Sequence, residues 1–184
     1  MIPPAFRGAM ERDAGPELLI LDVDGVLTNN IILLDGDGGE WKPFYVPDGT
    51  GIHLLQIVGV KVALVSGRLS AVVHRRAKEL GIDWHLSGVR DKSKAVRDIL
   101  NQAGASREHA VYVGDDLIDI PAMREVDLPV AVANAPEEVR RESVAVTRAQ
   151  GGQGAVREVC EWILAARGEW ARVLEKVTRP DPES

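Results

Sequence analysis

Two aspartates separated by one residue, Asp22 and Asp24, are the earliest residues in the chain whose type and spacing could do chemistry. Residues 18–21 before them are all apolar, too few for a helix and close to Gly25, which predicts a buried parallel strand ending at the pair. Because strand side chains alternate with period two, we expect both carboxylates on one side of the chain, where they repel each other. A divalent cation between them relieves that repulsion, and Mg²⁺ is the cation that best suits carboxylate, phosphate and water oxygens.

A calcium loop or a simple turn is the alternative interpretation of this segment. An EF-hand loop needs further acidic ligands at fixed spacing between two helices, whereas the residues before Asp22 predict a strand. Asp35 and Asp37 could also bind a cation, but turn chemistry accounts for their Asp-Gly repeat without one. We therefore expect the metal at the first aspartate pair.

Polar side chains also follow the other apolar segments of the chain. They are Ser66 after the run at 60–65, Lys92 at the start of a helical pattern over 92–103, and Asp115, Asp116 and Asp119 after the run at 110–113. In a doubly wound parallel sheet the carboxyl ends of the strands converge on one crevice, so these residues can share a substrate. A serine, a lysine and several acids around a cation make a phosphate-binding site.

Strand patterns alternate with helical patterns along most of the chain. Further strands are predicted at 84–86, 128–132 and 144–146, and further helices from Asp48, from the N-cap Ser70 to a stop at Gly81, from Pro136, and over 154–166. This order predicts an α/β fold, a doubly wound (Rossmann-like) parallel sheet with helices on both faces. Apolar residues on both sides of the turn at 35–39 predict a β-hairpin over 30–46, a flap beside the site.

The length and composition limit the class of protein. The chain has 184 residues, of which 45% are hydrophobic and 27% charged, enough for a single domain, expected over 17–168 between a flexible leader (1–16) and a C-terminal tail (169–184). The net charge of −6 argues against a nucleic-acid partner. No signal-peptide pattern or membrane-length apolar run is present, so we expect a cytoplasmic location, with no membrane partner. Cys160, the one cysteine, lies among apolar residues at helical spacing and is predicted to be a core residue.

Four motifs, taken in order, resemble those of the haloacid dehalogenase superfamily of phosphatases. They are Asp-x-Asp-Gly-Val-x-Thr at 22–28, Ser66 at the end of the second apolar strand, Lys92, and Gly-Asp-Asp-x-x-Asp at 114–119. The segments at 48–52, 65–68, 112–119 and 151–160 further resemble the capless 3-deoxy-D-manno-octulosonate 8-phosphate (Kdo-8-phosphate) phosphatases, across residues 17–168. The resemblance implies a haloacid dehalogenase-type fold without a cap domain and a Mg²⁺-dependent phosphatase acting on a small sugar phosphate, Kdo-8-phosphate.

The resemblance also implies a role for each catalytic residue. Asp22 would be the nucleophile that forms an aspartyl-phosphate, and Asp24 would act as general acid and then as base. The carboxylates of Asp22 and Asp115 and the backbone carbonyl of Asp24 would hold Mg²⁺. Ser66 and Lys92 would hold the phosphoryl oxygens, although a simple turn at Ser66 and a competing role for Lys94 are alternatives.

The resemblance places further residues around these groups. Asp116 and Asp119 would orient Lys92 and metal-bound water, unless either is only an exposed charge at a helix start. The residues expected near the sugar are Thr28, Asp48, Gly49, Ser66, Gly67, Arg68 and Lys92. The guanidinium of Arg68 is the candidate for binding a carboxylate bidentately, with an exposed, uninvolved charge as the alternative.

The family's assembly and three unusual residues bear on the substrate. In these enzymes a homotetramer replaces the cap domain, because a neighbour's hairpin and C-terminal tail close over the crevice. Pro47 and Gln153 stand where basic residues are usual, and Asn134 stands where Asp is usual, so positive charge toward a sugar acid is reduced. Two alternatives follow, a phosphatase for a nonulosonic acid 9-phosphate or another sugar phosphate, and a non-catalytic tetramerisation module.

Overall fold

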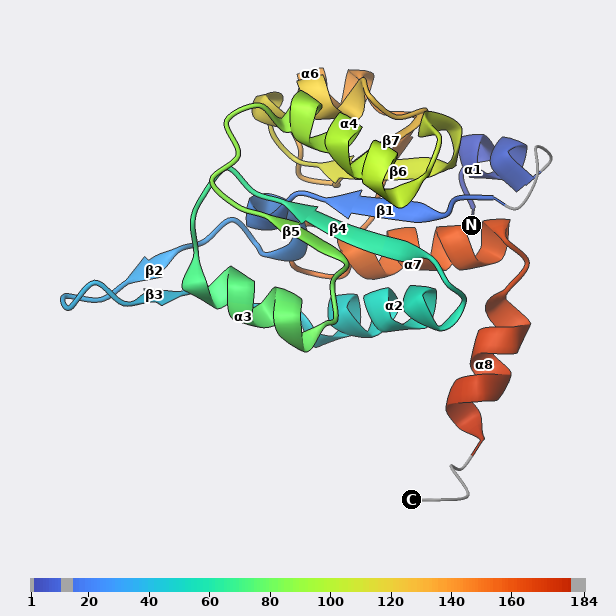
Figure 1. Ribbon diagram of the computed structural model, residues 1–184, viewed down its shortest axis with the longest axis horizontal. Helices are drawn as coiled ribbons and strands as arrows, with labels where there is room; N and C mark the ends of the chain where they lie inside the picture. The colour runs from blue at the N-terminus through green and yellow to red at the C-terminus, as the bar shows by residue number, and fades with distance from the viewer. Residues whose placement is uncertain (1, 11–14, 180–184) are drawn as a thin grey trace.

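A six-stranded parallel sheet forms the middle layer of the molecule (Figure 1). The structure is a computed structural model and describes residues 2–10 and 15–179. The strands are β1 (Leu18–Leu21), β4 (Lys61–Val65), β5 (Trp84–Leu86), β6 (Ala110–Gly114), β7 (Leu128–Ala131) and β8 (Ala145–Val146). Their order in the sheet is β5-β4-β1-β6-β7-β8, and every neighbouring pair is parallel. The predicted doubly wound parallel sheet is confirmed.

Helices cover both faces of this sheet (Figure 1). On one face lie α2 (Val46–Ile57), α3 (Ala71–Glu79) and α7 (Ala155–Ala166), and on the other lie α4 (Lys92–Ala103) and α6 (Glu137–Arg141), with the short α5 (Ile120–Met123) packed against α4. None of the described helices combines the length and the apolar character needed to cross a membrane.

Burial explains why the sequence forms these elements. All side chains of β1 are fully buried, because the strand lies in the middle of a sheet with helices on both faces. Helix α4 instead buries one apolar face, which includes Val96 and Ile99. Its first turn is capped by Asp91, whose carboxylate accepts a hydrogen bond from the Lys94 amide at 2.9 Å. Gly104, at φ +65°, ends the helix where the sequence predicts.

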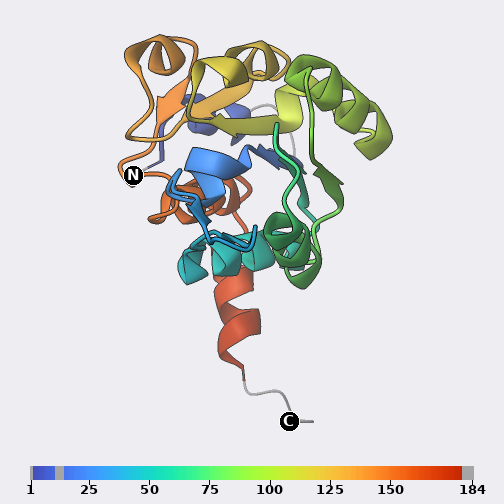
Figure 2. The same ribbon diagram turned by 90° about the vertical axis from the view of Figure 1, so that its left-hand side faces the viewer.

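A short hairpin leaves the body of the fold between β1 and α2. Its strands, β2 (Leu33–Leu34) and β3 (Glu40–Trp41), pair antiparallel. The hairpin projects from the side of the molecule at which β1 ends, the side that faces the viewer in Figure 2. Its strands are shorter than predicted, because the backbone turns into α2 at Val46. Asp35 closes the turn by accepting hydrogen bonds from the amides of Asp37 and Gly39, which agrees with a turn rather than a metal site. The described residues contain no separate cap domain.

Both chain ends carry helices that the sequence pattern did not indicate. Within the expected leader, Pro4–Met10 form helix α1, whose Phe6 is fully buried with its ring 5.6 Å from that of Trp162 on α7. The aromatic contact gives α1 a partner that its own composition does not reveal. Trp170–Thr178, in the expected tail, form α8. The rest of the leader and tail, residues 1, 11–14 and 180–184, lies outside the described residues.

The carboxylate of Asp48 ties α2 to the N-terminus of α7. Its two oxygens accept hydrogen bonds from the backbone amides of Arg157 at 2.8 Å and Gly154 at 3.4 Å. Burial raises the pKa of Asp48 to about 6, although these amide donors oppose the rise. The sequence placed Asp48 near the sugar, but the structure turns its side chain into the interface between two helices. The Asp48 carboxylate therefore joins two helices, and Asp48 is not among the residues that line the cavity at the strand ends.

Replacing this side chain should cost stability without affecting substrate binding. We expect Asp48→Ala to lower the free energy of unfolding by about 1–3 kcal/mol, because buried amides at the start of α7 lose their acceptor. Urea denaturation measures this loss, and the exposed Asp98→Ala serves as the control, with a change within about 0.5 kcal/mol. A selective rise in KM with unchanged stability would instead return Asp48 to the substrate site.

Candidate active site

A cavity of about 200 Å³ opens where β1, β4 and β6 end. Its lining residues are Asp22, Asp24, Asn30, Ser66, Gly67, Arg68, Lys92, Asp115, Asp116 and Ile118. The carboxyl ends of neighbouring parallel strands thus bring together most of the residues that the sequence singled out. These residues come from parts of the chain that are far apart in sequence.

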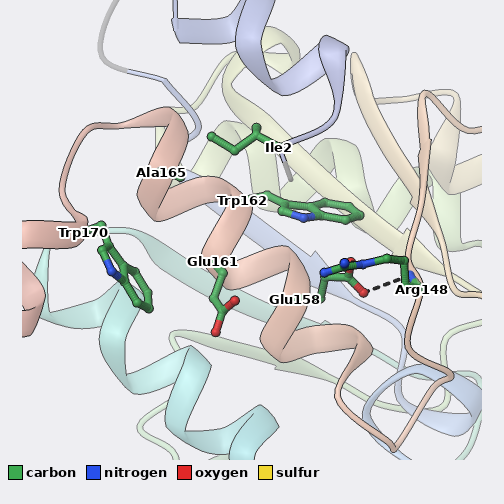
Figure 3. Close-up of a pocket in the computed structure, with 7 residues that line it drawn as sticks. All are labelled: Ile2, Arg148, Glu158, Glu161, Trp162, Ala165 and Trp170. Carbon is green, nitrogen blue, oxygen red and sulfur yellow. Dashed lines mark hydrogen bonds and ion pairs between the residues drawn. The ribbon is translucent and has the colours of Figure 1, made fainter.

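Two other hollows lie beside α8 and differ in character. One, of about 280 Å³, is lined mainly by apolar side chains of α2 and α8. The other, of about 260 Å³, lies between Trp162 and Trp170 (Figure 3). Its buried carboxylate, Glu158, is already satisfied by the Arg148 side chain and by the amides of Arg148 and Ala149. The cavity at the strand ends is therefore the candidate active site.

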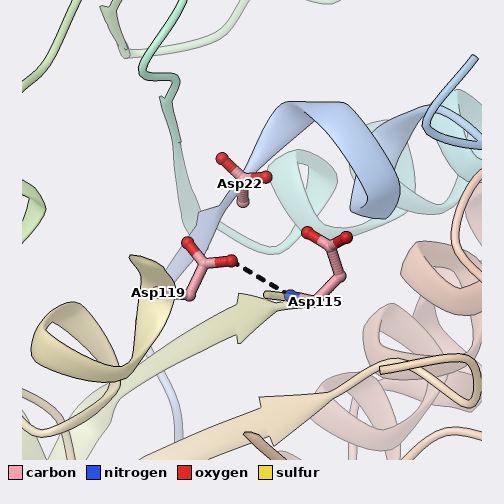
Figure 4. A group of neighbouring side chains, drawn as sticks. All are labelled: Asp22, Asp115 and Asp119. Carbon is pink, nitrogen blue, oxygen red and sulfur yellow. Dashed lines mark hydrogen bonds between the residues drawn. The ribbon is translucent and has the colours of Figure 1, made fainter. Parts of the chain in front are cut away.

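Three carboxylates lie close together, two of them in the lining of this cavity (Figure 4). Asp22, Asp115 and Asp119 are buried, and one oxygen of each lies within 4.8 Å of the others. Gly25 permits this arrangement, because a Cβ at its position would lie 2.0 Å from the Asp115 carboxylate, and its φ of +101° disfavours other residues. A glycine directly after Asp24 is therefore a steric requirement of the cluster.

One buried ammonium group partly balances these acids. The Nζ of Lys92, in the first turn of α4, donates to Asp22 at 2.6 Å and to Asp119 at 2.7 Å. Burial opposes the charge on this lysine, but the two carboxylates outweigh it and raise the pKa of Lys92. Lys94, the competing candidate, is exposed and pairs with Asp98. The geometry therefore favours Lys92 for the phosphate site.

Asp119 is satisfied entirely by protein donors. One oxygen accepts from Lys92 and from the Tyr112 hydroxyl, both at 2.7 Å, and the other accepts from the amides of Asp115 and Asp116. With four donors around it, Asp119 is poorly placed to be a metal ligand and well placed to fix Lys92 and the loop after β6. The predicted contact with Lys92 is thus made by Asp119.

The oxygens of Asp22 and Asp115 fit a divalent cation. Oδ1 of Asp115 is buried and has no hydrogen-bond partner among the described residues. Burial first, and then the neighbouring carboxylates, raise the pKa of Asp22 to about 7 and that of Asp115 to about 8, and Lys92 offsets this only in part. Such oxygens are the ligands that a hard divalent cation prefers, and the cation supplies the missing positive charge.

The loop after β4 contributes the remaining polar groups of the cavity. The Ser66 hydroxyl is buried and accepts a hydrogen bond from the Arg68 amide at 3.1 Å, as the turn interpretation predicts. Ser66 also lines the cavity, so a turn and a place in the site are compatible. The Arg68 side chain is about half exposed, and its guanidinium lies 3.6 Å from Glu40 on the hairpin. This guanidinium can still turn toward a ligand in the cavity.

Three other predicted residues make contacts that differ from the predicted ones. Thr28 is fully buried and bonds within its own turn, accepting from the Gly25 amide. Gly49 lies against the Arg76 side chain rather than in the cavity lining. Asp116 lines the cavity, but its carboxylate accepts from the Leu117 amide at 2.7 Å and makes no contact with Lys92 in the hydrogen bonds of the described residues. The alternative interpretation of Asp116, a charge at a helix start, fits these contacts best.

Two residues near the cavity were not predicted from the sequence. Asn30, at φ +65°, donates from its side-chain amide to Asp115 at 3.3 Å. Lys42 is buried at the end of the hairpin, with its Nζ 2.5 Å from Asp24. The signals were weak, because Asn tolerates positive φ but also occurs in ordinary turns, and a single lysine after a strand is usually exposed.

One of the three unusual residues, Asn134, has a clear structural role. Its side-chain oxygen accepts a hydrogen bond from the Gly151 amide at 3.0 Å, as a carboxylate oxygen at this position could do. Gly151 packs on the backbone of the turn after β1 (residues 22–28), where a Cβ would come within 1.6 Å of the Gly25 carbonyl oxygen. Although Asp is usual at this position in the family, Asn134 thus makes the same kind of contact, which fixes the loop around Gly151.

Comparison with known proteins identifies the family. The family model for haloacid dehalogenase-like hydrolases matches residues 86–158. The chain is 44% identical over 166 residues to the 3-deoxy-D-manno-octulosonate 8-phosphate phosphatase KdsC of Escherichia coli K12, an alignment that covers 90% of this chain and 88% of the relative. The chain belongs to the Kdo-8-phosphate phosphatase family.

Solved structures of this family share the fold throughout. The Kdo-8-phosphate phosphatase of Yersinia pestis is 41% identical, with a TM-score of 0.85 and coverage of 89% of this chain and 88% of that one. The enzyme of Moraxella catarrhalis, solved in complex with magnesium ion, phosphate ion and a KDO molecule, is 38% identical, with a TM-score of 0.88 and coverage of 94% and 99%.

The raised pKa values predict how pH and metal affect stability. Without metal, the native protein holds protons on Asp22 and Asp115 that the unfolded chain, with carboxyl pKa values near 3.8, has released. Thermal stability should therefore fall as pH rises from about 4 to about 8. Mg²⁺ should raise the Tm more at about pH 8 than at about pH 5, because protons compete with the metal.

Calorimetry of the chelator-treated protein with and without Mg²⁺ measures both effects. Asp115→Asn should remove most of the Mg²⁺-dependent gain in Tm, whereas Asp98→Asn should leave it unchanged. A Tm that does not respond to Mg²⁺ at either pH would contradict the metal site.

Proposed function

We propose that this protein is a Mg²⁺-dependent phosphomonoesterase that hydrolyses Kdo-8-phosphate to Kdo and phosphate. The observation that carries the proposal is the meeting of Asp22, Lys92 and Asp115 at one cavity, in a chain that belongs to this family. A non-catalytic module has no use for a buried cluster of mutually repelling acids. This chain has such a cluster, and its presence favours the catalytic hypothesis over the non-catalytic one.

The proposed reaction has two steps. Lys92 holds one oxygen of Asp22, and the carboxylate attacks the phosphorus atom while the bond from phosphorus to the sugar oxygen breaks. Asp24 gives its proton to the leaving sugar oxygen. It then takes a proton from a water molecule, which attacks the phosphorus of the aspartyl-phosphate and frees Asp22 and phosphate. Ser66 and Lys92 donate hydrogen bonds to the phosphoryl oxygens throughout.

The metal would be held by Asp22 and Asp115 through their carboxylates and by the backbone carbonyl of Asp24. When bound, Mg²⁺ supplies positive charge that offsets the phosphoryl oxygens and the clustered acids. The Asp24 side chain is not free for this purpose, because Lys42 holds it. Asp119 keeps Lys92 in place between the nucleophile and the loop after β6.

Arg68 is our candidate for binding the carboxylate of the sugar acid, and Gly67 lets the loop approach the substrate closely. Pro47 lies in the first turn of α2, and Gln153 adds no charge. With no basic side chain at either position, Arg68 carries more of the recognition. Substrate choice is therefore decided around Arg68 rather than around the metal.

Phosphate release from a panel of sugar phosphates tests this function. We expect Mg²⁺-dependent turnover with the highest kcat/KM on Kdo-8-phosphate, and a loss of at least about 10³-fold in kcat for Asp22→Asn with the fold intact by circular dichroism. A higher kcat/KM on a nonulosonic acid 9-phosphate would assign the nine-carbon acid instead. Full activity in Asp22→Asn would refute the nucleophile.

We further propose a homotetramer in which a neighbour's hairpin and C-terminal tail close over the cavity, and a cytoplasmic location. The hairpin supports the assembly, because Leu34 is 70% exposed and Trp41 66% exposed beside the site. The face of α8 that includes Leu174 and Val177 is also exposed and apolar. The buried free thiol of Cys160 suits a reducing compartment.

Light scattering coupled to size exclusion tests the assembly. We expect a tetramer for the native chain and a smaller species for Leu34→Glu, with lower kcat/KM on Kdo-8-phosphate because the cavity loses its cover. Glu108→Lys, a charge change beside the start of β6 and far from the hairpin, is the matched control and should leave the mass unchanged. A native monomer would contradict the shared site.

A further inference from the structure

Lys42 is an unusual residue because its ammonium group is buried beside the proposed acid. Its side chain is 0% exposed, and its Nζ lies 2.5 Å from Asp24 Oδ1 and 3.4 Å from a Glu40 oxygen. Lysine is almost never fully buried unless it is paired, and burying its charge is costly. The buried positive charge of Lys42 must therefore be compensated by the carboxylates beside it, and its position there needs an explanation.

The surroundings of Lys42 place it behind Asp24 rather than in the cavity. Asp24 lines the cavity, whereas Lys42 is not among the lining residues. The second carboxylate, Glu40, is itself fixed, since it accepts a hydrogen bond from the Ser70 hydroxyl at 2.7 Å. Ser70 in turn caps the start of α3. Lys42 is thus anchored through the hairpin to the body of the fold and presents its charge to one oxygen of Asp24.

We propose that Lys42 is a positioning residue for Asp24, an inference that rests on the proposed function. Holding Oδ1 of Asp24 fixes the rotation of the carboxylate and leaves its other oxygen for the leaving group. Asp24 becomes negatively charged as it gives its proton to the sugar oxygen, and the fixed ammonium of Lys42 offsets that developing charge. The hairpin segment therefore has a second function besides covering a neighbour's cavity, because it carries the group that orients the acid.

The competing explanation is that Lys42 only neutralises acids and anchors the hairpin. Buried ion pairs often serve no more than this, and removing one partner destabilises the protein. The two explanations differ in the substrates for which removing Lys42 should lower kcat/KM. An alkyl leaving group such as a sugar oxygen needs a proton from Asp24, whereas 4-nitrophenolate leaves without one. A purely structural role would affect both substrates alike.

The test compares kcat/KM for Kdo-8-phosphate and 4-nitrophenyl phosphate in Lys42→Met. This parameter reports the steps up to loss of the leaving group and excludes later hydrolysis of the aspartyl-phosphate. We expect a fall of about 10–100-fold on the sugar phosphate and less than about 3-fold on 4-nitrophenyl phosphate. Lys42→Arg should recover part of the loss, and the exposed Lys94→Met should change neither value. Equal falls on both substrates would overturn the proposal.

A double-mutant cycle with Asp24→Asn provides the second arm. If Lys42 acts through Asp24, adding Lys42→Met to Asp24→Asn should lower kcat/KM on the sugar phosphate by less than about 2-fold. Additive losses would refute the proposal. If Lys42→Met shows no cooperative unfolding transition and so does not fold, Lys42→Leu, which also removes the donor toward Asp24, replaces it in both arms. A native enzyme that is inactive on every sugar phosphate would contradict the proposed function instead, so the two failures are distinguishable.

Discussion

The charge balance between one buried lysine and three buried carboxylates governs the architecture of this site. Lys92 contacts Asp22 and Asp119, but a single ammonium does not neutralise the cluster, and the pKa values of Asp22 and Asp115 stay raised to about 7 and about 8. The protein alone therefore holds an incomplete site. A divalent cation and a phosphoryl group complete it. The cation supplies positive charge for the carboxylates, and the phosphoryl oxygens bind the cation and Lys92.

The fold serves this balance by fixing each charged group from a different element. Asp22 ends β1, Lys92 begins α4, and Asp119 closes the turn after β6 with four hydrogen bonds. Only a glycine at position 25 lets the turn after β1 pack against Asp115. Lys42, directly after β3, contacts Asp24, so the proposed nucleophile and the proposed acid each contact a buried lysine of their own. Two aspartates that lie two residues apart in the sequence therefore have different charged neighbours, which fits the different roles proposed for them.

The sheet, the amphipathic α4 and the strand-end residues could be predicted, because short apolar runs, caps and period-two spacing are local properties of the sequence. The parts that the sequence did not reveal depend on contacts between distant segments. Asp48 was expected near the sugar, but its carboxylate accepts a hydrogen bond from an amide in the first turn of α7. Phe6 packs on Trp162, so part of the expected leader is a packed helix. Lys42 contacts Asp24 only because the chain directly after β3 returns to the turn that follows β1. No local pattern carries that information.

Trapping the phosphorylated enzyme tests the central claim most directly. In the Asp24→Asn variant, Asp22 should still attack 4-nitrophenyl phosphate, because the leaving group needs no proton. The aspartyl-phosphate should then hydrolyse slowly, because the base that activates water is missing. Acid quenching followed by peptide mass spectrometry should then find one phosphoryl group on Asp22 in the presence of Mg²⁺, and none when Asp22→Asn is added. Nitrophenol release with no phosphoryl group on the protein, or a phosphoryl group on another residue, would contradict the account.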